Sequence, residues 1–384
     1  MPATTKPYRA EQVGSLLRPP EVLEAHAAQA AGKLSLDELR EIEDKAILMV
    51  LEMQRQAGID VLSDGEYRRS SWAGGFPEAV EGYVASTMPI AFTWRLDEEA
   101  GNLSPEELEA AFKSVPQQTG RVIGERIRQV KRLTGHEAPF LKEHAGGPFK
   151  ITMAAPSYVV ARGFKPGVTT SVYPTRGDLM NEVTAIYKDE VTWLLEQGVP
   201  YIQLDNPHYP DYIEESRRQQ WRDIGIEPEK AILEDIAGDN ACLEGINREG
   251  VTIATHICRG NGRSAWHTQG GYEPIAEQVF GGLNVDTFLL EYDSDRSGGF
   301  EPLRFIPKGK NVVLGLVTTK TGALESQDVL MRRIEEATRY VPVENLALSP
   351  QCGFASVDAG NLLTWDEQRR KLELVAETAR KVWG

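Results

Sequence analysis

Four side chains of types that commonly bind metal ions follow apolar stretches of this sequence. His256 and Cys258 stand two residues apart in ATHICRGN, Glu291 ends TFLLE, and Cys352 follows LALSPQ. Two thiolates, one imidazole and one carboxylate suit tetrahedral Zn²⁺, and sulfur ligands select it over Mg²⁺. The His-x-Cys pair alone is equally consistent with a packed histidine and a small buried cysteine. The four residues together predict a zinc site, provided that the fold brings them to one place.

Polar residues also follow the other apolar stretches, and we interpret them as candidates for substrate binding or catalysis. Apolar stretches do not end in acidic, basic or metal-binding side chains this regularly through composition alone. A ring of such residues is expected around the mouth of a barrel, where the carboxyl ends of the strands meet. The candidates are Gly14 and Ser15 after Val13, Glu66 after VLSDG, Asp205 after YIQL, and Lys320 after LVTT.

The elements that must position these residues alternate along the chain. Short β-rich runs are separated by longer amphipathic stretches, several of which end in a helix-capping glycine. The later runs are almost continuously apolar, which is typical of parallel strands covered on both faces. About eight such units favour an α/β fold of the closed (β/α)₈ TIM-barrel type, and no glycine-rich fingerprint supports a dinucleotide-binding sheet. The strand candidates are 10–17, 59–66, 139–144 with 148–155, 201–207, 251–261, 285–293, 311–320 and 345–353.

The segment 67–144 interrupts this alternation after the second predicted strand. It is polar and aromatic, and its run SPEELEAAFKSV at 104–115 has a helical pattern. We interpret it as an insertion into one domain that spans residues 1–384. Its role, as a lid, a hairpin or a partner surface, is left open by the sequence.

Composition excludes several classes of partner. The formal net charge of −15 disfavours binding to nucleic acid or to an anionic membrane surface. Membrane-helix and secretory-signal patterns are both missing, so a cytoplasmic protein is expected. With three cysteines, a disulfide framework is not expected, and Cys242 is interpreted as a buried helical cysteine. The oligomeric state is not indicated.

The motifs QVGSLLRP, DVLSDGE, YIQLDNP, ATHICRGN, TFLLEYD, VVLGLV and LSPQCGFAS, in this order, carry a family resemblance. The sequence resembles the catalytic barrel of cobalamin-independent methionine synthase, and short bacterial homologues that consist of this barrel alone. The resemblance implies Zn²⁺ on the four residues named first. It also implies that backbone near Val13, Gly14 and Ser15 receives the carboxylate of homocysteine, and that Glu66 and Asp205 hold its ammonium group.

The sequence departs from the family pattern where the methyl donor would bind. The second, N-terminal barrel of the full-length enzyme has no counterpart here, and Asn206 replaces the glutamate expected before Pro207. An aromatic platform expected after the third strand is missing from the run at 153–155. Lys320 stands where the family places a histidine that protonates the folate leaving group. A lysine there donates a proton or binds an anion, so the methyl donor stays open.

These observations predict a zinc-dependent enzyme that transfers a methyl group from a small-molecule donor to a thiol, most simply homocysteine. The same set of metal-binding residues is similar to that of a related enzyme, epoxyalkane:coenzyme M transferase. The alternative is therefore the opening of an epoxide by zinc-bound coenzyme M. The carboxylates of Glu66 and Asp205 favour a thiol that carries an amine. A purely structural zinc, or a redox role of Cys352, are hypotheses of other classes.

For two loops that follow predicted strands, a role in ligand binding is only a minor hypothesis. Arginines in loops are more often solvated than bound to a ligand, and self-paired charges are typical of a surface. The first loop contains Arg259, Asn261 and Arg263, which either recognise an anion at the rim of the barrel or are solvated. The second loop contains Asp293, Asp295 and Arg296, and we predict that it is a self-paired surface loop.

Overall fold

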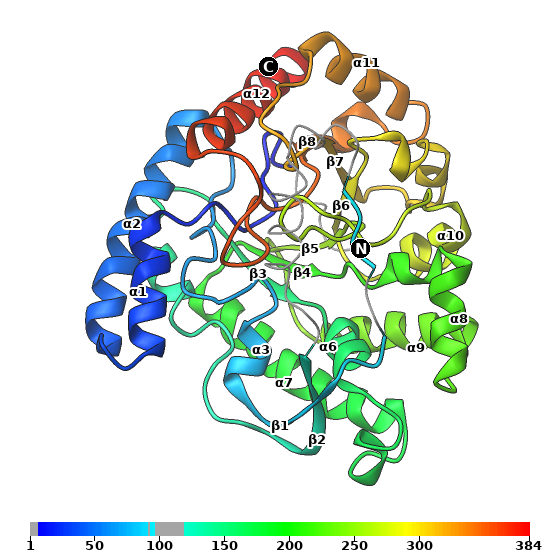
Figure 1. Cartoon of the computed structure of the whole chain (residues 1–384). Coiled ribbons are helices and arrows are strands. Elements are labelled where there is room, and N and C mark those ends of the chain that lie inside the picture. The colour runs from blue at the N-terminus through cyan, green and yellow to red at the C-terminus, as the bar shows by residue number, and fades with distance from the viewer. Residues whose placement is uncertain (1–6, 91–92, 97–118) are drawn as a thin grey trace.

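The computed structural model describes residues 7–90, 93–96 and 119–384, and its centre is a parallel β-sheet. Six strands pair in chain order, each with the next, through parallel hydrogen bonds. Helices surround these strands in Figure 1. The strands are β3 (Lys150–Ala154), β4 (Tyr201–Asp205), β5 (Thr252–Ile257), β6 (Thr287–Glu291), β7 (Asn311–Val317) and β8 (Leu346–Pro350).

Two extended segments close the ring between β8 and β3. The first bonds to β8 through the amide of Glu11 and the carbonyl of Leu348 at 2.9 Å. The second bonds to β3 through the amide of Lys150 and the carbonyl of Leu62 at 2.8 Å. The two segments meet where the amide of Asp60 donates to the carbonyl of Ala10 at 2.9 Å. The predicted eight-stranded α/β barrel is confirmed, although its first two strands are reduced to isolated bridges.

The barrel has a packed interior and a larger outer core. One layer of inward side chains comes from seven of the eight ring positions, as expected for a filled barrel. The remaining apolar residues pack between the strands and the surrounding helices. The inner layer consists of Val13, Val61, Tyr201, Ala254, Leu289, Val313 and Ala347.

Two of the long helices begin and end at residues with recognisable capping chemistry. Ser35 and Thr175 each form a capping box, with Glu38 and Asp178 respectively, that satisfies orphan amides at the helix start. Gly58 ends α2 in the left-handed conformation at φ 86°. The longer helices are α1 (Pro20–Ala30), α2 (Leu36–Ala57), α6 (Pro156–Gly163), α7 (Arg176–Gln197), α8 (Glu215–Asp223), α9 (Pro228–Ala241), α10 (Glu273–Gly282), α11 (Gln327–Ala337) and α12 (Trp365–Trp383).

The insertion forms an antiparallel hairpin of β1 (Val80–Thr87) and β2 (Thr119–Gln129), flanked by the short helices α3 (Gly75–Ala79) and α5 (Ala138–His144). The strand predicted at 139–144 is therefore wrong, because that run is α5. Ala138, Leu141 and Ala145 are buried at helical spacing, and this pattern was overlooked beside the neighbouring PFKITMAA. The helical run predicted at 104–115 lies outside the described residues.

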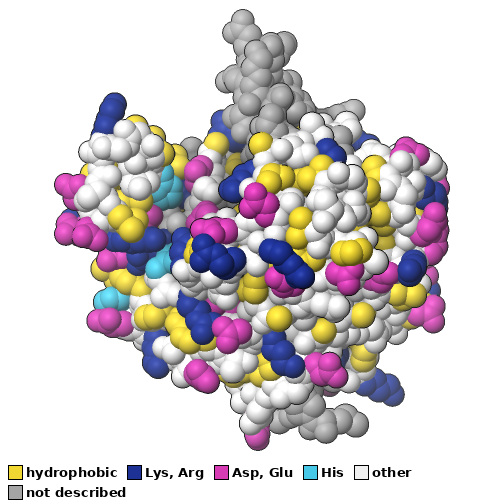
Figure 2. All heavy atoms as spheres, turned by 90° about the horizontal axis from the view of Figure 1, so that it is seen from below, with side chains coloured by type: hydrophobic (Ala, Val, Ile, Leu, Met, Phe, Trp, Pro, Cys, Tyr) yellow, Lys and Arg dark blue, Asp and Glu magenta, His cyan; other side chains and the backbone are white. Residues whose placement is uncertain are grey.

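The surface carries charges of both signs. Figure 2 shows basic and acidic side chains interspersed over one face. Among the described helices, none combines the length and apolar character that crossing a membrane requires.

Candidate functional site

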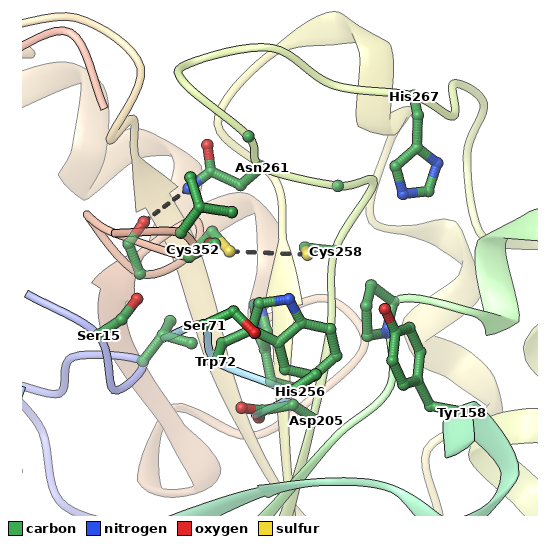
Figure 3. A pocket seen from close by; sticks show the side chains of 18 of the residues that line it. Ser15, Ser71, Trp72, Tyr158, Asp205, His256, Cys258, Asn261, His267 and Cys352 are labelled. Carbon is green, nitrogen blue, oxygen red and sulfur yellow. Dashed lines mark hydrogen bonds between the residues drawn. The ribbon is translucent and has the colours of Figure 1, made fainter. Parts of the chain in front are cut away.

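Three of the four predicted metal ligands meet at the carboxyl ends of β5 and β8. His256 lies in β5, Cys258 follows that strand directly, and Cys352 comes two residues after β8. Their donor atoms all lie within 4.8 Å of one another, and all three residues are buried. The two sulfur atoms are 3.7 Å apart (Figure 3). Residues separated by almost a hundred positions in the sequence thus form one group.

The geometry of this group fits a metal ion. Both ring nitrogens of His256 are buried, and no hydrogen-bond partner is found for either among the described residues. Such orphaned buried nitrogens are rare and call for a ligand. Two sulfur ligands at about 2.3 Å from a tetrahedral zinc ion lie about 3.8 Å apart, close to the spacing observed here.

The two thiols have opposite pKa shifts. The pKa of Cys352 lies well below the usual thiol value, because of the adjacent Cys258 sulfur and of the charge of the nearby His256 imidazole. The pKa of Cys258 lies well above that value, because of the adjacent Cys352 sulfur and of burial. The shift at Cys352 favours the thiolate, which is the form in which a cysteine binds a metal ion.

The carboxylate of Glu291 lies beside this group and is held by other partners. One oxygen accepts the backbone amide of Arg259 at 2.6 Å, and the other accepts the guanidinium of Arg296 at 2.9 Å. Burial raises the pKa of Glu291, but the charges of Arg296 and Arg259 outweigh it and lower the pKa to about 2. Glu291 is thus ionised and adjacent to the group. Its role as a fourth ligand stays a prediction.

Of the two predictions about the loops that hold Glu291, one is wrong and the other is confirmed in part. Arg259 is fully buried and reaches neither the rim nor solvent, since it donates to the carbonyl of Gly270 at 2.8 Å and stacks 4.1 Å from the Tyr272 ring. The self-paired surface loop is confirmed in part. Arg296 pairs with Asp293 at 3.4 Å and Asp295 is exposed, but only 6% of the Arg296 side chain is exposed. Both arginines are part of the support of Glu291.

A cavity of about 300 Å³ adjoins the metal-ligand group. In Figure 3 the sulfur atoms of Cys258 and Cys352 face each other, and Asp205 lies beside His256, its partner on the neighbouring strand. The cavity is mainly apolar, with a few convergent polar groups, as is usual for small-molecule sites. Its lining includes Val13, Ser15, Glu66, Ser71, Trp72, Met88, Trp94, Tyr158, Asp205, His256, Cys258, Asn261, His267 and Cys352.

Glu66 and Asp205, which we call the lining carboxylates, are both buried in this cavity. Burial raises the pKa of Glu66 to about 7 and that of Asp205 to about 6. Thr152 donates to one oxygen of Glu66 at 2.7 Å, while the other oxygen is buried, with no partner among the described residues. Glu66 also has φ 61°, a strained backbone that points to function. Both carboxylates would gain from a cationic ligand.

The predicted backbone site at 13–15 lies next to these carboxylates. Val13 and Ser15 line the cavity. A Cβ atom on Gly14 would come within 2.7 Å of the Glu66 carboxylate, so glycine permits the close approach of the two segments. Residues 13–15 thus line the cavity beside Glu66, and their role in substrate binding stays a prediction.

Lys320 is buried behind the cavity wall, and it is not one of the residues that line the cavity. Its ammonium group lies 3.4 Å from the carbonyl of Gly260 and 3.3 Å from the side-chain oxygen of Asn261. Asn261 itself donates to the carbonyl of Gly353 at 2.6 Å. The lysine thus braces the loop after β5, and a direct role in proton transfer stays a prediction.

Sequence reasoning missed the aromatic wall of the cavity. The platform expected after the third strand is supplied by Trp72 and Trp94 from the insertion and by Tyr158 from the first turn of α6. The rings of Trp72 and Tyr158 are 4.7 Å apart. Tyr158 could have been found, since it follows β3 closely, whereas no local pattern links the two tryptophans to the barrel mouth.

Comparison with known proteins agrees with this geometry. Residues 9–92 and 152–381 match the model of the catalytic domain of cobalamin-independent synthase. The chain belongs to this family. The unmatched stretch 93–151 covers the later part of the insertion.

Relatives span almost the whole chain. The uncharacterized protein YxjH of Bacillus subtilis is 37% identical over 98% of this chain and 95% of its own length. The methionine synthase of Pyrococcus abyssi is 24% identical over 90% of this chain and 86% of its own. A structure from Listeria monocytogenes, provisionally named as a vitamin-B12-independent methionine synthase, is 29% identical and matches with a TM-score of 0.70 over both full chains.

A B12-independent methionine synthase from Shewanella, solved with selenomethionine, matches over 98% of both chains with a TM-score of 0.69 and 22% identity. At this identity the likeness concerns the fold alone. The family match makes this chain a methionine-synthase-like catalytic domain, and the two structures share its fold.

Proposed function

We propose that this protein transfers a methyl group to the thiol of homocysteine, giving methionine, at a zinc ion held by His256, Cys258, Cys352 and Glu291. The observation that carries the proposal is the position of two buried carboxylates and a sulfur-rich ligand group on one small cavity. An amino-acid thiol matches both groups, since its ammonium suits the carboxylates and its sulfur suits the metal ligands. When bound, Zn²⁺ lowers the pKa of a coordinated thiol, so that the sulfur is a nucleophilic thiolate near neutral pH.

The residues of the chain orient the substrate. The lining carboxylates accept charge-assisted hydrogen bonds from its ammonium group, which places its thiol toward the two cysteine sulfurs. The backbone at 13–15 receives its carboxylate. Glu291 is the ligand best suited to give way to an incoming sulfur, because Arg296 already holds one of its oxygens. The aromatic wall keeps water from the reacting sulfur.

The proposal is tested by X-ray absorption at the zinc edge of the metal-loaded protein. Addition of homocysteine should increase the number of sulfur ligands from two to three. A structural zinc would keep the same ligands, and this result would contradict the proposal. Coenzyme M serves as the comparison thiol, because it has no ammonium group. Tighter binding of coenzyme M than of homocysteine would favour the epoxide-opening alternative.

Steady-state methionine formation adds a second readout. Glu66→Gln and Asp205→Asn should raise KM for homocysteine about tenfold to a hundredfold, since each removes one charge-assisted hydrogen bond. The zinc content of both variants should not change. Unchanged KM in both variants would show that the ammonium group binds elsewhere.

A further inference from the structure

The charge of the cavity differs from what an anionic methyl donor requires. Among the described residues that line it, two are carboxylates and none is lysine or arginine. A donor with a glutamate tail or a phosphate would bring further negative charge into a buried site that already holds two acidic groups. Burial without a partner is costly for such charges.

The nearest cations do not neutralise the lining carboxylates. Arg69 lies 3.9 Å from Glu66, but its guanidinium is paired with Glu137 at 2.6 Å. Lys150, whose charge acts on Asp205, is paired with Glu11 at 3.0 Å. Each cation thus already has a carboxylate partner. After one substrate ammonium binds between the lining carboxylates, the site still favours a second positive charge.

The cavity is also small and aromatic. Sites that bury a drug-sized ligand range from roughly 300 to 1,000 Å³, so a cavity of about 300 Å³ that must hold a thiol substrate has room for few further atoms. Trp72 and Trp94 line it, and the face of an indole is the best aromatic site for a cation. Tyr158 already faces the guanidinium of Arg162 at 5.3 Å and packs against Trp72.

We propose that the methyl donor is a small methylsulfonium compound whose cationic sulfur binds against Trp72 and Trp94 in this cavity. This inference rests on the proposed function, since it concerns the second substrate of the same site. It names the donor class that the family resemblance leaves open.

The chemistry of a sulfonium donor matches the groups present. The thiolate sulfur attacks the methyl carbon and forms a carbon–sulfur bond, while the bond from methyl to the sulfonium sulfur breaks and its electron pair stays on the departing thioether. The thiolate and the sulfonium cancel in charge, and no proton is transferred. A general acid is therefore not needed. This agrees with the position of Lys320, which does not line the cavity, and with His267, whose pKa burial lowers to about 3, so that it carries no imidazolium proton to donate near neutral pH.

Binding is measured first, by calorimetry on the zinc-loaded protein with homocysteine present. Trimethylsulfonium is the probe, and choline is compared with its neutral isostere 3,3-dimethylbutan-1-ol. The cations should bind at least about tenfold more tightly than the neutral alcohol. Equal affinity of choline and the alcohol would overturn the inference, because the cavity would then select for shape alone.

Variants locate the binding site. Trp72→Leu and Trp94→Leu should each weaken trimethylsulfonium binding about tenfold, whereas Trp383→Leu, on the far end of α12, should not. Zinc content and the homocysteine-dependent gain of a zinc–sulfur contact should be the same in all three variants. If the affinity for trimethylsulfonium is unaffected by both cavity variants, the inference is wrong.

Methyl transfer is then measured with isotopically labelled trimethylsulfonium, methyltetrahydrofolate and methylcobalamin. Labelled methionine should form fastest from the sulfonium. Faster transfer from either of the other donors overturns the inference but leaves the proposed function intact. Failure of homocysteine to add a sulfur to the zinc contradicts the proposed function itself, so the two failures are distinguishable.

Discussion

Two buried histidines at the carboxyl ends of adjacent strands have opposite surroundings. His208, three residues after β4, uses both ring nitrogens: one lies 3.0 Å from Asp211, and the other lies 3.0 Å from Tyr212 and 3.2 Å from Asp235. His256, in β5, has a partner for neither nitrogen among the described residues. Both side chains are almost completely buried.

The difference shows how a structural histidine is told from one that binds a ligand. The carboxylates around His208 are in turn neutralised, since Arg217 donates to Asp211 at 2.7 Å and Arg176 donates to Asp235. That cluster is complete within the protein. The group around His256 is instead incomplete, and a buried polar group without a partner is costly unless a ligand satisfies it. Burial and residue type alone do not distinguish the two histidines.

Removal of a sulfur ligand should have the largest effect. Cys352→Ser should abolish stoichiometric zinc binding and lower methionine formation about 10³-fold, the range seen when electrostatic stabilisation is lost at a reacting centre. Metal analysis and initial rates check this result. Cys242→Ser is the matched control, because Cys242 is buried outside the cavity. Full zinc content in the Cys352 variant would contradict this prediction, because zinc binding would then not depend on the Cys352 sulfur.

Disruption of the complete cluster should affect stability instead. His208→Ala removes one buried hydrogen-bond partner from each of Asp211 and Asp235, and should lower the free energy of unfolding by about 3 kcal/mol. Urea denaturation of the metal-free protein measures the change. His256→Ala should cost less in the same assay, because no hydrogen bond is lost. A larger loss for the His256 variant would reverse the comparison.

The next prediction concerns Glu66 and the pH dependence of the free energy of unfolding. Burial raises its pKa from about 4.3 in the unfolded chain to about 7, so the folded protein binds this proton more tightly. The resulting stability is fully present below about pH 4 and is lost as the pH rises through 7. Glu66→Gln should therefore stabilise the metal-free protein at pH 8 by about 2 kcal/mol. Thermal unfolding at pH 5 and pH 8 tests this, and an equal difference at both values would contradict it.

The smallest expected effect concerns the support of Glu291. Arg296→Gln removes the cation that holds one carboxylate oxygen, so the carboxylate becomes a stronger metal ligand. Zinc affinity should rise about tenfold, in the range typical of residues that orient metal ligands, and homocysteine should bind more weakly. Chelator competition and thiol titration measure the two effects. Arg304→Gln, at an exposed ion pair with Glu273, is the control.

Much of the barrel could be predicted from local patterns. The apolar runs that form β4 to β8 are too long to be turns. A glycine that ends the preceding helix, such as Gly198 before β4, also marks where a strand can begin. The strand predicted at 139–144 failed because a six-residue run with one proline fits a strand or a short helix, and burial at helical spacing became clear only after packing. The first two strands were predicted as regular elements, yet each is reduced to an isolated bridge.

The sequence by itself determined which residue types stand at the ends of the strands, because parallel strands and their connections leave a local signature in apolar content and glycine position. It therefore indicated His256, Cys258 and Cys352. Only the tertiary structure decided that Arg259 and Arg296 are buried supports of Glu291, and that two tryptophans of the insertion enclose the cavity. These contacts join segments far apart in the chain, and nothing in a local pattern depends on the partner that a side chain meets after folding.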